Sequence, residues 1–353
     1  MFESLNLGKA IDLTRRTMPI ILIRLGVNII FWVVGIIYFL IVGAVAALIG
    51  SAIEFLGVII FIVGIGGMFA LYHLAYRYVF YIIKAAHIAI VSELLQNGKI
   101  KDSEGQLAYG KKLVQERFGE VNAMFVVDEL VSGVVRGFTR TIYNIASWLP
   151  GDTLQTLVQI LNRIIWFATT YIDEAVLARS FYEDEQDNVW ANARDGVVLY
   201  AMRWKPILMN AVALMILSYI PFIVAFVLFS LPVGALISIF SQQLAGWSLI
   251  ILLLLSWMVK VAIGDSFAMI AMIATYHRET AGVQPDAEMA AKLDGISDKF
   301  QELARKAGEA IGLNKRKAAP VAPVTPTSPE SPIDTTVETG DFPPDNDPLP
   351  TTD

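Results

Sequence analysis

The 353-residue chain contains no cysteine, and histidine occurs only at His73, His87 and His277. Without cysteine the chain can form neither a disulfide nor a thiolate metal site, and it has no thiol nucleophile. No two histidines are four residues apart, so the paired-histidine zinc motif of metalloproteases is also missing. We therefore expect no bound metal and no cofactor.

The main enzymatic sequence signatures are missing as well. The chain has no phosphate-binding loop of the G-x-x-x-x-G-K-[ST] type, no G-x-S-x-G nucleophile elbow and no glycine-rich dinucleotide fingerprint after a strand. We therefore expect a protein that is not an enzyme. Its basic residues are scattered along the boundaries of apolar segments, which argues against nucleic acid as a partner.

Charged residues are scarce. They make up 17% of the chain, against about 25% in an average soluble domain, while 55% is hydrophobic and the mean hydropathy is +0.57. The net charge of −6 comes from the segment after Lys317, which holds seven acidic residues and no basic one. This composition predicts an all-α, polytopic membrane protein with membrane lipid as its main partner.

Six apolar segments are long enough to be transmembrane helices. The second continues as an amphipathic helix to about Asn97, and Pro221 is expected to kink the fifth. The segments lie at about residues 25–49, 55–74, 121–148, 154–178, 206–231 and 247–276.

The third of these segments is the most charged, since it contains Asp128, Glu129, Arg136 and Arg140. Each such charge at the centre of a membrane costs about 2.5–3.5 kcal/mol on insertion scales. The segment can cross only if these side chains face protein, water or one another.

The turns near residues 50–54, 149–153 and 231–246 contain no lysine or arginine, whereas the segments on the opposite side are rich in both. The positive-inside rule places the basic side in the cytoplasm. We expect a multi-pass protein of the cell (inner) membrane with both termini in the cytoplasm.

Apart from the three short outer turns, the parts outside the spans are expected to be cytoplasmic. They comprise an amphipathic lead-in at 1–20, helices at about 103–117 and 189–204 within the membrane domain 21–280, a helix at 285–313 and a disordered, proline-rich acidic tail at 314–353.

The helix at 285–313 has a regular apolar stripe, which allows three placements: on the inner leaflet, under the bundle, or in a coiled coil with a cytoplasmic protein partner that binds residues 285–353. The stripe consists of Met289, Leu293, Ile296, Phe300, Leu303, Ala307 and Ile311.

Three segments share a short pattern of an aromatic residue, alanine and glutamate at equal spacing. They begin at Tyr81, Tyr171 and Phe267 and end at Glu93, Glu183 and Glu279. The pattern predicts three copies of one unit, in which an outer hairpin and a descending span lead into an inner amphipathic helix. The alternative is that span ends look alike because tyrosine favours interfaces and alanine favours helix packing.

Ionisable residues inside the apolar segments are candidates for a polar interior, because such groups are costly in a membrane. The repeat places His73 and Arg163 at equivalent positions, with Lys260 one position away. The structural alternative is interhelical salt bridges, with Arg77 and Lys84 reaching to the inner surface. The full candidate set is His73, Asp128, Glu129, Arg136, Arg163, Asp173, Glu174, Lys260 and Asp265.

Within this set, Asp173 and Glu174 are adjacent and point about 100° apart on a helix, so they do not converge on one ligand unaided. The sequence favours their interpretation as interfacial charges beside Arg179. Gly133 and Gly137 form a G-x-x-x-G motif, which indicates close helix packing within the chain or a homo-oligomer interface.

The segment from Phe167 to Pro206 contains A-T-T-Y-I-D-E-A-V-L-A-R-S-F-Y-E-D-E and then N-V-W-A-N-A-R-D-G-V-V-L-Y-A-M-R-W-K-P. In this order of span end, amphipathic helix and next span, the chain resembles prokaryotic six-span membrane protein families of unknown function over residues 55–280. The resemblance implies a topology and no activity. The long C-terminal spans are weakly similar to choline-transporter-like proteins, and no residue role is carried over from them.

Two main functions stay open at this point, and a membrane enzyme that acts on lipid is a third class. The first is movement or binding of a small polar or anionic solute in a charged bundle interior, which the embedded charges favour. The second is a non-transporting scaffold or accessory subunit that recruits cytoplasmic partners through its surface helices and tail.

Overall fold

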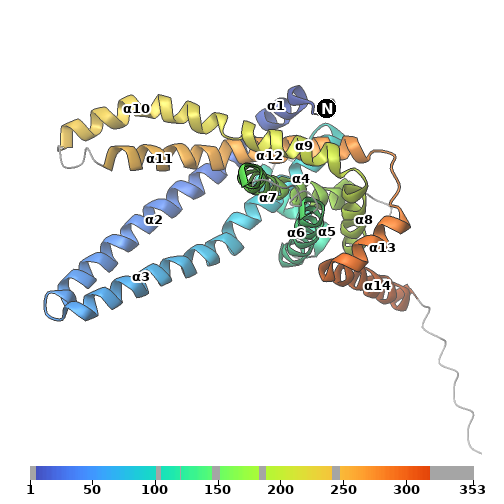
Figure 1. Cartoon of the computed structure of the whole chain (residues 1–353), viewed down its shortest axis with the longest axis horizontal. Helices are drawn as coiled ribbons and strands as arrows, with labels where there is room; N and C mark the ends of the chain where they lie inside the picture. Colours follow the sequence, from blue (N-terminus) through green and yellow to red (C-terminus); the bar gives the residue numbers. More distant parts are fainter. Residues whose placement is uncertain are drawn as a thin grey trace, which may run out of the picture.

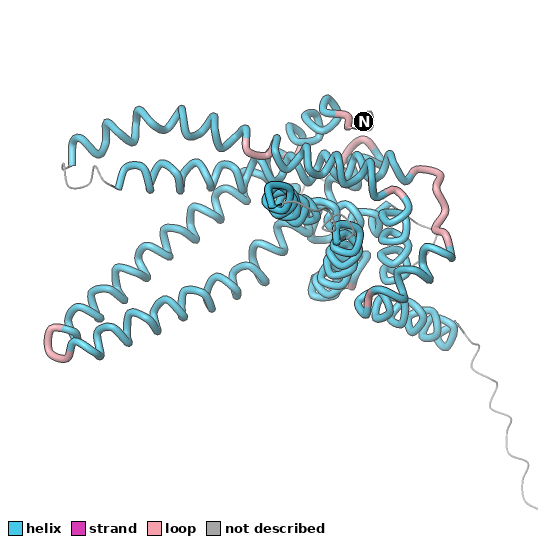
Figure 2. Tube along the Cα trace, viewed as in Figure 1, coloured by secondary structure: helices cyan, strands magenta, loops and turns pink. Residues whose placement is uncertain are grey.

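The computed structural model describes residues 5–100, 105–119, 121–144, 152–182, 188–240 and 247–318, and every regular element in these ranges is helical (Figure 2). The description excludes the side chains of residues 121, 142–144, 152–165, 167, 236–240 and 311–318. The tail was predicted to be disordered from residue 314, but the last helix continues to Ala318, and the rest of the tail lies outside these ranges.

Two long helical hairpins extend from one side of a helical body (Figure 1). The first consists of α2 (Met18–Gly50) and α3 (Glu54–Ala75), and the second of α10 (Ile220–Phe240) and α11 (Ser248–Val259). Their apolar side chains face outward, and Leu48 near one tip is 77% exposed. Such surfaces need lipid, because water would strongly disfavour them.

Four helical stretches are long and apolar enough to cross a membrane among the residues searched. They are Met18–Gly50, Glu54–Asn97, Trp204–Ala235 and Ser248–Thr280. They match four of the six predicted spans, including the amphipathic extension to Asn97.

The other two predicted spans, 121–148 and 154–178, correspond to α6 (Val121–Asn144) and α7 (Asp152–Tyr182) and are not among the four. Glu129, Arg136 and Arg140 all lie on the exposed face of α6. Lipid would not accept three charges on that face, so the expected six-span count is not confirmed.

Small residues let the two helices of the first hairpin approach closely. A side chain on Gly57 would lie 2.7 Å from the carbonyl oxygen of Ala46, and one on Gly64 would collide with the side chain of Val42. The hydroxyl of Tyr38 donates a hydrogen bond of 2.9 Å to the Gly64 carbonyl oxygen. The glycines of α3 therefore close the hairpin onto α2.

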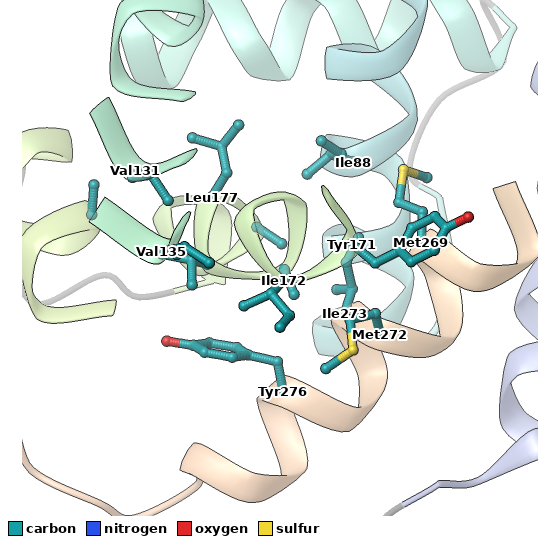
Figure 3. Close-up of a cluster of buried hydrophobic side chains, with 14 of the residues drawn as sticks. Ile88, Val131, Val135, Tyr171, Ile172, Leu177, Met269, Met272, Ile273 and Tyr276 are labelled. Carbon is teal, nitrogen blue, oxygen red and sulfur yellow. The ribbon is translucent and has the colours of Figure 1, made fainter. Parts of the chain in front are cut away.

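The body has a hydrophobic core at its centre. Side chains from α4, α6, α7 and α12 meet there, among them Ile88, Val131, Ile172 and Ile273 (Figure 3). The two core helices not yet bounded are α4 (Tyr81–Asn97) and α12 (Asp265–Thr280). The other helices of the body pack around the core: α1 Leu7–Arg16, α5 Gln106–Phe118, α8 Val189–Met202, α9 Trp204–Leu217, α13 Ala287–Ile296 and α14 Asp298–Ala318.

Two of the spans enter the body through π-helical turns. Tyr76–Phe80 joins α3 to α4, and Lys260–Gly264 joins α11 to α12. A π-helical turn is rare and occurs frequently at functional sites, because the extra residue changes the direction of nearby side chains. Both turns lie where a hairpin meets the body.

The three segments that share the sequence pattern lie in α4, in α7 as far as Tyr182, and in α12, and these three helices pack against one another. An amphipathic helix packs on each of them: α5 on α4, α8 on α7, and the N-terminal α1 on α12. Residues Ala10 and Leu13 of α1 are therefore buried in the body. The predicted unit differs from this arrangement in its third copy, because the helices that follow α12 pack on α6 and α8, so the repeat is not confirmed.

Two further expectations concern helix boundaries. The fifth span breaks at Ser218–Tyr219, one turn before Pro221, because proline has no N–H for the carbonyl four residues earlier and its ring clashes with that carbonyl. The helix expected at 285–313 divides at Ser297 into α13 and α14. Its stripe residues Leu293, Phe300 and Leu303 are buried, and the two helices pack on α6 and α8. Of the three placements, packing under the bundle is the one observed.

Candidate functional site

A cavity of about 270 Å³ lies at the base of the two hairpins, where both π-helical turns join the body. Three cationic side chains line it, Arg24, Lys84 and Lys260, together with the carboxylates Glu174 and Asp265. These residues come from α2, α4, α7 and the Lys260–Asp265 region, so distant segments of the chain assemble one polar chamber.

Lys84 is the centre of a buried ion-pair network. Its Nζ lies 3.3 Å from Oδ2 of Asp128 on α6 and 3.2 Å from Oε1 of Glu174 on α7. Burying a charge is tolerated only when it is paired, and this lysine neutralises carboxylates from two other helices. The interpretation that Lys84 reaches to the membrane surface is therefore wrong.

A second pair forms across the π-helical turn. Nζ of Lys260 lies 2.6 Å from Oδ1 of Asp265, five residues later, and it faces the rings of Tyr219 and Trp257 at 4.8 and 5.3 Å. The hydroxyl of Tyr171 donates a 2.7 Å hydrogen bond to the same Asp265 oxygen. Burial and the nearby Asp265 raise the pKa of Tyr171, so its hydroxyl stays a donor.

Arg24 is the third cation of the cavity and the only charged residue within α2. Its Nη1 donates a 3.1 Å hydrogen bond to the hydroxyl of Ser266. Among the ion pairs of the described residues, none joins Arg24 to a carboxylate. Guanidinium carries five donors in a planar fork, so Arg24 retains capacity for an anion.

Asp173 lies beside Glu174 on α7 and is buried, but it does not line the cavity. Its Oδ1 accepts a 2.8 Å hydrogen bond from the backbone N–H of Glu174. Burial raises the pKa of both carboxyls, that of Asp173 to about 8, although the charge of Lys84 opposes the effect. The expectation of interfacial charges at this pair is therefore wrong.

Two buried polar atoms at the cavity have no hydrogen-bond partner within the described part of the chain. They are the hydroxyl oxygen of Tyr81, which lines the cavity and is 2% exposed, and Oδ1 of Asp128. Buried polar atoms are nearly always satisfied, so each exception needs an explanation.

Of the residues predicted for the polar interior, Asp128, Glu174, Lys260 and Asp265 come together at this cavity. His73 is exposed on α3 and Glu129 is exposed on α6. Neither lines the chamber.

The other two predicted cations are not placed in the chamber either. Arg136 is exposed and its guanidinium faces the ring of Trp166 at 5.3 Å. The side chain of Arg163 lies outside the described residues. The proposed equivalence of His73, Arg163 and Lys260 therefore does not place three cations at one site.

The sequence-based set missed Arg24, Lys84, Tyr81 and Tyr171. One signal was available for Arg24, because it alone interrupts an apolar run of about thirty residues. Lys84 carried no comparable signal, since its partners lie 44 and 90 residues away in the sequence.

One glycine of the G-x-x-x-G motif takes part in helix packing within the chain. A side chain placed on Gly133 would lie only 3.1 Å from that of Lys299 on α14, which packs on α6, whereas one placed on Gly137 would have no neighbour within 4 Å. The cavity thus remains the best-defined polar feature.

In comparisons with protein-family models, curated proteins and solved structures, the chain matches none of them.

Proposed function

We propose that this protein is anchored in the membrane by its two apolar hairpins and binds a small anionic group in the cavity at their base. The single observation that carries the proposal is the cavity next to outward-facing apolar helices, where Lys84 and Lys260 are paired with carboxylates and Arg24 has no carboxylate partner among the described ion pairs. A guanidinium with unused donors favours an anion.

The membrane placement is supported by the exposed apolar side chains of both hairpins, which include Leu48 and Leu231. Both hairpins extend from the same side of the body, which contains α1 and α14, and this supports a topology with the hairpin ends on one side of the membrane and the body on the other. The turn at 51–53 contains no basic residue, whereas the body is rich in them. The positive-inside rule then assigns the body to the cytoplasm of a cell with an inner membrane.

Arg24 and Tyr81 give the anion its contacts. Arg24 has no carboxylate partner among the described ion pairs, and the buried Tyr81 hydroxyl lacks an acceptor among the described residues. An anionic oxygen would satisfy both donors. Lys84 and Lys260 are already paired, so their role is to offset Asp128, Glu174 and Asp265 and to leave the guanidinium of Arg24 for the anion.

Binding is better supported than conduction. Beyond Asn28, α2 continues to Gly50 with polar atoms only on the side chains of Trp32 and Tyr38, and α11 is apolar apart from two serines and a tryptophan. A hydrated path toward the hairpin tips would need polar lining groups. Of the two roles expected for a charged interior, movement or binding of a solute, the geometry therefore favours binding.

The direct test is a thermal-shift titration of the purified full chain with glycerol 3-phosphate, in which unfolding is monitored by tryptophan fluorescence. A ligand that binds only the folded state raises Tm as its concentration exceeds Kd. We expect a concentration-dependent rise for the wild type and its loss in Arg24→Gln.

Arg15→Gln is the matched control, because Arg15 is exposed on α1 and is not part of the cavity lining. It should respond to glycerol 3-phosphate as the wild type does. The absence of any shift in the wild type, or an equal shift in Arg24→Gln, would disprove the proposed anion site.

A further inference from the structure

An apolar groove of about 450 Å³ opens between α2 and α3 next to the cavity. Its lining includes Phe39, Ile65 and Met68, which are apolar and belong to the first hairpin. The groove shares Asn28 and Tyr72, as well as Phe80, with the polar cavity, so the two spaces are contiguous.

A second apolar groove, of about 500 Å³, lies between α2 and the second hairpin. It is lined by the side chains of Phe222, Ile250, Leu253 and Leu254 and by two tryptophans, Trp32 and Trp257. Trp32 lines both grooves. Trp257 lines the second groove and contacts Lys260 of the cavity through a cation–π interaction of 5.3 Å.

The geometry points to one occupant for all three spaces: a two-chain glycerophospholipid with an anionic phosphate headgroup, its phosphate in the cavity and one acyl chain in each groove. This inference rests on the proposed anion site and names its ligand class. The division into one polar chamber and two apolar grooves matches the division of such a lipid into one headgroup and two chains.

The phosphate is assigned to the cavity because guanidinium is suited to bind two phosphate oxygens at once, and Arg24 lines the chamber. The depth is also suitable. Tyr72, Tyr76 and Tyr219 line the chamber and Trp257 lies beside it, and such aromatic residues concentrate at the level of lipid headgroups. A lipid bound there would have its chains parallel to the hairpins.

The test compares dioleoyl phosphatidic acid with dioleoyl phosphatidylcholine, titrated into the delipidated full chain in detergent and counted by native mass spectrometry. Ile65→Trp fills the first groove and Leu254→Trp fills the second. We expect each to weaken phosphatidic acid binding about tenfold while the response to glycerol 3-phosphate is unchanged.

Matched controls are Ile62→Trp on α3 and Leu249→Trp on α11, because both positions are exposed and line neither groove. They should bind phosphatidic acid like the wild type. Arg24→Gln should lose the preference for phosphatidic acid over phosphatidylcholine.

Three results would overturn the inference. Groove-filling variants that bind like their controls would place the chains elsewhere. Equal binding of both lipids would remove the role of the phosphate. Glycerol 3-phosphate binding without tighter phosphatidic acid binding would identify a free anion as ligand and leave the proposed function standing, whereas loss of both would disprove that function as well.

Discussion

Lys84 of α4 is a buried cation that forms ion pairs with carboxylates of two other helices. It pairs with Asp128 and Glu174, and Asp173 lies next to them on α7. Three helices from separate parts of the chain therefore depend on a single ammonium group for charge balance. Such a network is weak evidence for net stability, but removing one partner is costly because it leaves buried charge unpaired.

Replacing Lys84 with methionine should destabilise the protein by about 3–5 kcal/mol, since it leaves the carboxylates without their cation. The measurement is Tm and folded yield after detergent extraction. The triple variant that also carries Asp128→Asn and Glu174→Gln should recover part of the loss. Lys112→Met, at an exposed position on α5, should behave like the wild type. A K84M protein as stable as the K112M control would contradict the network's importance.

Asp173 should make stability depend on pH. Burial raises its pKa from 3.8 to about 8, so between these values the folded protein retains a proton that the unfolded chain releases. Stability therefore falls as pH rises through this window. Asp173→Asn removes the effect, and its Tm should gain several degrees relative to wild type between about pH 6 and pH 9.

The control for this comparison is Asp12→Asn, because Asp12 is partly exposed on α1, outside the buried network. It should keep the wild-type pH profile. Parallel profiles for wild type and D173N would show that Asp173 is already ionised in the folded protein.

At the scale of elements, the junction between α9 and the π-helical turn depends on a glycine. A side chain on Gly264 would overlap the carbonyl oxygen of Ser218, which is backbone and cannot rotate away. This close approach brings the break between α9 and α10 next to Lys260 and Asp265. The glycine thus helps to shape one wall of the cavity.

Gly264→Ala should push the two elements apart and cost about 1–3 kcal/mol, as overpacking does elsewhere. Gly43→Ala is the matched control, because nothing lies within 4 Å of a side chain at that position. Thermal stability should fall in the first variant only, together with the response to glycerol 3-phosphate. Equal Tm values would show that the junction can relax without loss.

The sequence predicted the elements better than their partners. The apolar runs at 25–49 and 55–74 were sufficient to locate α2 and α3, and Pro221 correctly marked the break after α9. For α6 hydropathy was not sufficient to decide whether the helix crosses, because it sums over a helix and does not record which face bears Arg136 and Arg140. For the cavity, Lys260 and Asp265 were found because each interrupts an apolar run, whereas Lys84 was misassigned because its partners are remote in sequence.

At the scale of the whole molecule, the absence of cysteine makes the topology directly testable. Single cysteines can be introduced as Ser51→Cys in the first hairpin turn and Lys112→Cys on α5 of the body. A membrane-impermeant maleimide should label S51C in intact cells and K112C only after permeabilisation, because the proposed topology has the hairpin tips and the body on opposite sides.

Gly151→Cys, in the predicted turn at 149–153, discriminates between the span counts. With four spans it should label like K112C, and with six spans like S51C. Labelling of both S51C and K112C in intact cells would contradict the orientation itself.

The packing of α1 on α12 has a consequence for biosynthesis. The ribosome produces Leu7–Arg16 first and Asp265–Thr280 more than two hundred residues later, so the earliest helix must wait for one of the last before its apolar face is covered. Both hairpins can enter the bilayer during that interval, while α1 lies exposed on the surface. The body therefore cannot complete its assembly until translation is nearly finished, and a chain arrested before α12 would present Leu13 to chaperones and proteases.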